Sequence, residues 1–126
     1  MEQVSNLDSM YAAYQLEFED CYTIFEPNKG FANYKVEEHN ISNLEIYVKE
    51  VYVKPEYRGQ KLAASLTDKC IADAEKKYNR KVTKIYTTIG IGGNTVDLSI
   101  RSITNYGFKI LKADEQLIYF YKENQS

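Results

Sequence analysis

VKEVYVKPEYRGQKLAASL, residues 48–66, is the stretch that decides how this chain folds. It begins as a strand rich in β-branched and aromatic residues, passes through a Pro-Glu-Tyr turn and a basic Arg-Gly-Gln loop, and opens into an amphipathic helix. The first turn of a helix has backbone N–H groups without intrahelical acceptors, and the macrodipole adds partial positive charge there. With Arg58 and small residues beside these amides, the stretch predicts a binding site for a pyrophosphate.

The segments on either side of this stretch predict a mixed fold. Residues 3–18 repeat apolar side chains at helical spacing, and residues 60–77 and 96–103 are also predicted to be helical. Strands are predicted at residues 21–25, 31–36, 44–53, 82–89, 108–111 and 117–121, with a hairpin turn at 26–30. Antiparallel pairs combined with a strand–helix–strand unit predict an α/β (α+β) fold, with a mixed, mostly antiparallel central sheet and flanking helices.

Length and composition limit the classes of protein to which the chain can belong. Its 126 residues, 44% hydrophobic and 27% charged, predict a single domain over residues 1–126. The net charge of −2 argues against binding to nucleic acid. No apolar run has the length of a membrane span and no signal peptide is recognisable, so we expect a cytoplasmic protein that does not bind membranes. Cys21, Cys70 and the single histidine, His39, predict no metal site.

The motif around Arg58 resembles the phosphate loop of the GNAT acetyltransferase superfamily. That loop has Arg or Gln, two residues, Gly, one residue, and then Gly or Ala; here Arg58 takes the first position and Ala63 the last. Lys61 stands at the central position, where the family has glycine. A second match is Tyr106-Gly107-Phe108-Lys109, which is similar to the family's helix exit into its sixth strand. The resemblance covers residues 44–121 and implies a GNAT-like fold with a shortened N-terminal region.

The resemblance implies that acetyl-CoA is the acyl donor. In the family, main-chain groups of the strand before the phosphate loop pair with the pantetheine arm, and the loop and helix start bind the pyrophosphate. An asparagine in a later loop also contacts the cofactor in many members. Carried onto this chain, the implied contacts are Val51, Val53, Arg58, Gly59, Gln60, Lys61, Leu62, Ala63, Ala64 and Asn94.

The implied reaction is transfer of the acetyl group to a primary amine by direct attack in a ternary complex. Such a reaction is assisted by a base for the amine and a proton donor for the thiolate. Glu50, just before the pantetheine segment, is the first choice for the base, and Glu45 is the second; alternation places Glu45 on the face of residues 47, 51 and 53. The family's proton-donating tyrosine is replaced by Ile103, which leaves Tyr106 as the catalytic candidate, although a packing role suits it better.

Two readings compete with an active enzyme. Lys61 and Ile103 also fit a catalytically degenerate GNAT fold that serves as a protein-binding module, and the phosphate loop alone would suffice for a CoA-binding sensor. The sequence does not name the amine acceptor, a small molecule or a protein, and it leaves the oligomeric state open, with a homodimer among the options.

Overall fold

The computed structural model describes residues 21–59, 61–90 and 96–124, and the side chains within these ranges except those of residues 96–99. The predicted helix over residues 3–18 lies outside the described residues, as do Gln60 and Asn94.

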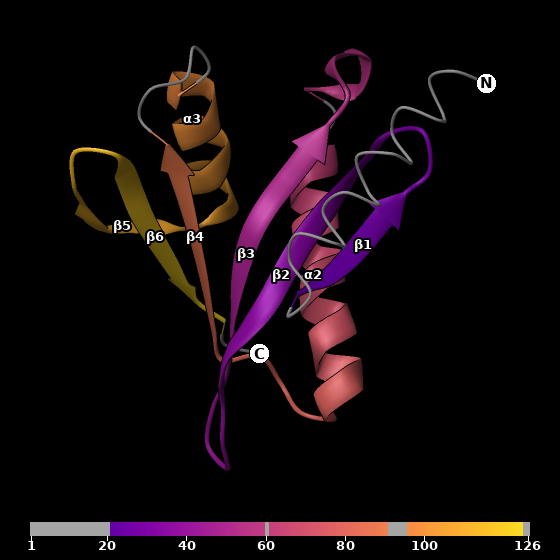
Figure 1. Ribbon diagram of the computed structural model, residues 1–126, viewed down its shortest axis with the longest axis vertical. Coiled ribbons are helices and arrows are strands. Elements are labelled where there is room, and N and C mark those ends of the chain that lie inside the picture. Colours follow the sequence, from indigo (N-terminus) through magenta and orange to yellow (C-terminus); the bar gives the residue numbers. More distant parts are fainter. Residues whose placement is uncertain (1–20, 60, 91–95, 125–126) are drawn as a thin grey trace.

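A six-stranded sheet with the strand order β1-β2-β3-β4-β6-β5 forms the centre of the molecule (Figure 1). The parallel pair is β3 with β4, and the other neighbouring strands are antiparallel. The strands are β1 (Tyr22–Glu26), β2 (Gly30–His39), β3 (Leu44–Val53), β4 (Lys84–Gly90), β5 (Lys109–Ala113) and β6 (Leu117–Glu123). The helices are α2 (Leu62–Tyr78) and α3 (Val96–Tyr106), with a 3-10 turn at Pro55–Tyr57. This mixed α+β architecture confirms the predicted fold class.

The turn between β1 and β2 depends on backbone geometry that few residue types accept. Asn28 has a φ of 66°, in the left-handed region that asparagine tolerates better than most residues. At Gly30 a Cβ atom would lie 2.1 Å from the main-chain oxygen of Tyr52 on β3. Gly30 therefore lets β2 approach β3 at the point where the turn becomes a strand.

The core lies between the helices and one face of the sheet, and its buried residues come from β2, β3, β4 and β6 as well as from α2. Leu66, Cys70 and Ala74 repeat at four-residue spacing and are fully buried, as the helical pattern predicts. They pack with apolar side chains of the sheet that include Ile46 and Val48. The Tyr34 hydroxyl donates a hydrogen bond to Asp73, which joins β2 to the helix at the edge of this core.

Helix α3 is the second helix on the same side of the sheet. Ile100 and Ile103 pack against the core, and the Tyr106 hydroxyl donates a hydrogen bond to Asp68 of α2. The helix ends at Gly107, whose φ of 120° suits glycine. The predicted exit motif therefore ends a helix and leads into β5, as the sequence indicated.

Candidate active site

The parallel strands β3 and β4 separate along their length. Residues 45–48 of β3 pair with residues 84–87 of β4, and the ladder stops there although both strands continue. Figure 1 shows the two strands diverging toward the ends of their arrows. A pocket of about 330 Å³ occupies this divergence. Its lining comes from four elements: residues 48–51 of β3, 87–90 of β4, Ala63, Ala64 and Thr67 of α2, and Ser102, Ile103 and Tyr106 of α3, with Phe108 below them.

The pocket reaches the first turn of α2. Two residues of the preceding loop have left-handed backbone, Gly59 at φ 83° and Lys61 at φ 61°. No side chain caps the helix, so the N–H groups of its first turn have no side-chain acceptor from the capping position. Ala63 and Ala64 add little bulk there. The first-turn amides, the positive end of the helix dipole, and the cations Arg58 and Lys61 of the preceding loop together suit a phosphate group at this end of the helix.

Arg58 links the loop to the end of β3. Its Nε donates a hydrogen bond to the Val53 carbonyl at 2.9 Å, a contact that the sequence analysis did not foresee. This bond uses one lone pair of the carbonyl and ties the guanidinium to the end of β3. Arg58 itself is exposed, so the rest of its planar donor set faces outward.

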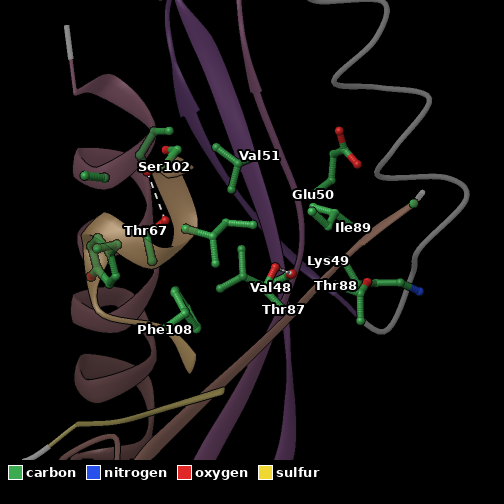
Figure 2. Close-up of a pocket in the computed structure, with 15 residues that line it drawn as sticks. Val48, Lys49, Glu50, Val51, Thr67, Thr87, Thr88, Ile89, Ser102 and Phe108 are labelled. Atoms are coloured by element: carbon green, nitrogen blue, oxygen red, sulfur yellow. Dashed lines mark hydrogen bonds between the residues drawn. The ribbon is translucent and has the colours of Figure 1, made fainter. Parts of the chain in front are cut away.

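A β-bulge on β3 determines the direction of Glu50. Tyr34 pairs with Val48 and Asn33 pairs with Glu50, so Lys49 is an extra residue in the strand. Beyond the bulge the alternation changes: Val51 joins Val48 on the α2 face, and Glu50 lies on the opposite face. Figure 2 shows Glu50 pointing away from Thr67 and Ser102 across β3.

The bulge corrects the expectation for Glu45. Simple alternation placed Glu45 on a face with Tyr47, Val51 and Val53, but the extra residue separates Tyr47 from the two valines. Glu45 is instead on the face of Glu50, at the closed end of the β3–β4 pair, and does not line the pocket. Its carboxylate accepts a hydrogen bond from the Tyr86 hydroxyl at 3.0 Å.

Glu50 lines the pocket from the face opposite α2 and is partly buried. Burial raises the pKa of its carboxyl above the ordinary value, because the charged form loses hydration there. A carboxylate with a raised pKa is a better base than one in water, since its conjugate acid is weaker. The site therefore contains a half-buried group suited to accepting a proton.

Tyr106 and Ile103 both line the pocket from α3. The Tyr106 hydroxyl donates its hydrogen bond to Asp68, and burial together with that carboxylate raises the pKa of the phenol. Its ring stacks on Phe108 with centroids 5.6 Å apart. These contacts are those of a residue that packs α3 against α2, and the hydroxyl proton is already engaged.

Several polar residues of the pocket were missed by the sequence analysis. Thr67 and Ser102 line it from the two helices, and Thr87 and Thr88 line it from β4. The Thr67 and Thr87 hydroxyls donate to main-chain carbonyls, of Ala63 and Val48 respectively. Threonine is common in strands and on helices, so no spacing in the sequence sets these residues apart.

Comparison with known proteins identifies this arrangement. Residues 4–98 match the family described as acetyltransferase (GNAT) family. The chain belongs to the GNAT acetyltransferase family. The match includes β3, the loop with Arg58 and α2, so the resemblance expected from the phosphate loop is confirmed.

Solved structures share the GNAT fold with this protein at low sequence identity. The PaiA N-acetyltransferase of Thermoplasma acidophilum, crystallised with coenzyme A, is 19% identical with a TM-score of 0.62, over 89% of this chain and 66% of that one. A Bacillus subtilis acetyltransferase in complex with CoA is 15% identical with a TM-score of 0.65, over 99% and 93%. Arabidopsis thaliana NAA60, bound to a bisubstrate analogue, is 12% identical with a TM-score of 0.67, over 96% and 95%.

A search of curated proteins found no significant match to this GNAT protein. Within the described ranges, no group of three His, Cys, Asp or Glu side chains is placed to hold a metal ion. None of the helices described here has the length and hydropathy needed to cross a membrane.

Proposed function

We propose that the protein is an N-acetyltransferase that moves the acetyl group of acetyl-CoA to a primary amine by direct attack in a ternary complex. The observation that carries the proposal is the pocket in the divergence of β3 and β4, which runs to the uncapped start of α2. Two of the similar GNAT structures are complexes with CoA, and NAA60 is bound to a bisubstrate analogue. These complexes support the proposal of an acyl-CoA site with an adjoining acceptor site.

In this proposal the donor binds along the pocket, with its phosphates at the start of α2. The pyrophosphate would bind to the amides of Leu62, Ala63 and Ala64, with Arg58 and Lys61 supplying positive charge. The pantetheine arm would lie along residues 49–53 of β3, whose edge toward β4 is not paired with that strand. Acetyl-CoA supplies an activated thioester carbonyl when bound. The remaining steps depend on side chains of this chain.

Glu50 is the residue proposed to accept the proton of the amine. It lies beside the β3 segment that would carry the thioester, and its raised pKa favours proton uptake. The leaving thiolate needs no dedicated acid in this scheme, because a thiol has a pKa of about 8.5 and its anion leaves readily. Tyr106 remains in the scheme as a candidate proton donor whose hydroxyl is bonded to Asp68.

The test of the proposal begins with calorimetric titration of acetyl-CoA, followed by steady-state transfer to a panel containing spermidine, lysine and a peptide with a free α-amine. Glu50→Gln is expected to lower kcat by about 10²–10⁴-fold, the range for loss of a general base. Glu45→Gln is the matched control on the same face of the sheet and is expected to leave kcat within about twofold. Full activity of Glu50→Gln would show that the base is elsewhere.

A protein without turnover is the alternative, in the form of a degenerate binding module or a CoA sensor. The engaged Tyr106 hydroxyl and the non-glycine residue Lys61 favour it. Calorimetry separates the readings: a sensor binds CoA without acetylating any amine, and a degenerate binding module binds no CoA. Acetyl transfer to any member of the panel would exclude both.

A further inference from the structure

Asn33 is a buried polar residue whose hydrogen bonds are incomplete. It lies in the middle of β2 and is 0% exposed. Its Nδ2 donates to Thr23 Oγ1 of β1 at 3.1 Å, whereas its Oδ1 is buried and has no hydrogen-bond partner among the described residues. Buried amide oxygens are nearly always satisfied in native proteins, so an unsatisfied one often marks a functional position.

Asn33 lies directly opposite Glu50 in the sheet. Thr23 pairs with Asn33, and Asn33 pairs with Glu50, so the three side chains form one polar row across β1, β2 and β3. Side chains of directly opposed residues share a face, with Cβ atoms roughly 4.5–5.5 Å apart. The bulge at Lys49 creates this pairing. Because Tyr34 pairs with Val48, a regular strand would place Lys49, and not Glu50, opposite Asn33.

The chemistry of the two groups is complementary in one protonation state. An ionised Glu50 and Asn33 Oδ1 are both acceptors and cannot bond to each other, whereas a protonated Glu50 has an O–H to donate. Burial of Glu50 is the cause of its raised pKa, and no charged side chain contributes. Among the residues that line the pocket, β3 also contributes Lys49 and β4 contributes the neutral Thr88, whereas the phenol of Tyr106 comes from α3 on the other face of the sheet.

We propose that Asn33 is a positioning residue for Glu50, and that its Oδ1 accepts a hydrogen bond from the Glu50 carboxylic acid once that group has taken a proton from the acceptor amine. An N–H bond of the acceptor's ammonium form breaks, its electron pair stays on nitrogen and makes the neutral amine a nucleophile, and the proton binds a Glu50 oxygen. The role of Glu50 rests on the proposed function, but the bond between the two side chains does not.

The test measures the pKa of Glu50 directly in protein labelled with 13C at the glutamate carboxyls, assigned with Glu50→Gln. Asn33→Leu keeps the approximate shape and removes the acceptor, so the pKa of Glu50 is expected to fall by about one unit, the effect of one net hydrogen bond. Thr23→Val is the matched control, because it disturbs the other end of the same amide and leaves Oδ1 in place. It is expected to leave the pKa of Glu50 within about 0.3 units.

An unchanged pKa in folded Asn33→Leu, or an equal shift in Thr23→Val, would overturn the proposal. If Asn33→Leu does not fold, the isosteric Asn33→Asp decides: a second carboxyl beside Glu50 should raise an apparent pKa of the pair, and no change would show that the side chains do not meet. In steady-state kinetics, the acidic limb of the pH profile of kcat/KM should move to lower pH in Asn33→Leu. Absence of transfer to every amine defeats the proposed function separately, because the carboxyl titration needs no turnover.

Discussion

Lys61 has a left-handed backbone conformation, at the position where the phosphate loop of the GNAT family has glycine. Its φ of 61° places the Cβ close to its own carbonyl, which costs L-residues roughly 1–2 kcal/mol. The strained residue precedes the first turn of α2, where its ammonium group adds positive charge.

The cost and the charge can be separated by substitution. Lys61→Gly is expected to have a free energy of unfolding about 1 kcal/mol greater than Lys61→Ala, because glycine alone adopts this φ without strain. Urea denaturation of the two variants measures the difference. Both lack the ammonium, so both are expected to bind CoA more weakly than the wild type at low salt, with the gap closing at high salt. Equal stability of the two variants would show that position 61 is not strained.

Glu50 makes the stability of the protein depend on pH. A carboxyl whose pKa is raised by folding binds its proton more tightly in the native state, so it costs stability above the native pKa. The cost disappears as the pH falls through the native pKa toward the ordinary value. Glu50→Gln is therefore expected to raise Tm at pH 8 and to have little effect at pH 4. Thermal unfolding across this range, with Glu45→Gln as the control, tests the sign; a variant that melts lower at pH 8 would contradict it.

At the scale of elements, the β2–β3 contact depends on Gly30. A Cβ there would meet main-chain atoms of Tyr52, which cannot move without breaking the strand pairing. Gly30→Ala is expected to lower the free energy of unfolding by more than about 3 kcal/mol, among the larger effects of single substitutions. Gly90→Ala is the control, since no atom of the described residues lies within 4 Å of a Cβ at that position. Similar urea midpoints for the two variants would disprove the steric argument.

Helices α2 and α3 are joined by the bond from Tyr106 to Asp68. Tyr106→Phe keeps the stacking on Phe108 and removes the hydroxyl, so it is expected to lower the free energy of unfolding by about 0.5–1.5 kcal/mol. If the thiolate leaves without a dedicated acid, kcat should change by less than about threefold. A fall of a hundredfold would instead make Tyr106 the proton donor, and the pH–rate profile would then lose its basic limb.

For the molecule as a whole, binding of acetyl-CoA is expected to stabilise the fold, because the donor would contact two elements at once. Acetyl-CoA in the pocket would contact β3 and α2, so at 100 times its Kd it should stabilise the fold by about 2.7 kcal/mol. Arg58→Gln should reduce the shift in Tm at a fixed concentration, whereas Arg80→Gln, at the other end of α2, should not. Equal shifts in the two variants would remove Arg58 from the phosphate site.

The order of the described strands and helices could be predicted from the sequence alone. Alternation found the strands, four-residue spacing found α2, and Gly107 marked the end of α3, with boundaries shifted by a few residues. These signals are local, because they depend on which face of one element is buried. The family motif that begins at Arg58 was also readable in the sequence, because the GNAT family match includes it, and its role in binding phosphate stays a prediction.

The direction of Glu50 and the position of Asn33 could not be read in the same way. A bulge is a relation between two strands, and the sequence of one strand shows it weakly: Lys49 and Glu50 are adjacent polar residues between Val48 and Val51, where alternation alone would have one. Alternation carried across this point produced the wrong face for Glu45. Asn33 is a polar residue inside an apolar strand, and its unpaired oxygen becomes visible only when its neighbours are placed.

The short β3–β4 ladder also divides the molecule along its sequence. Residues 21–78 form β1, β2, β3 and α2, residues 84–123 include β4, α3, β5 and β6, and among the described residues the chain passes between these groups once, through 79–83. Each wall of the pocket is therefore supplied by one continuous stretch of the amino-acid sequence. A chimaera of two relatives joined within this connection would exchange a complete wall, with its helix, so the donor side and the opposite side could be inherited from different parents.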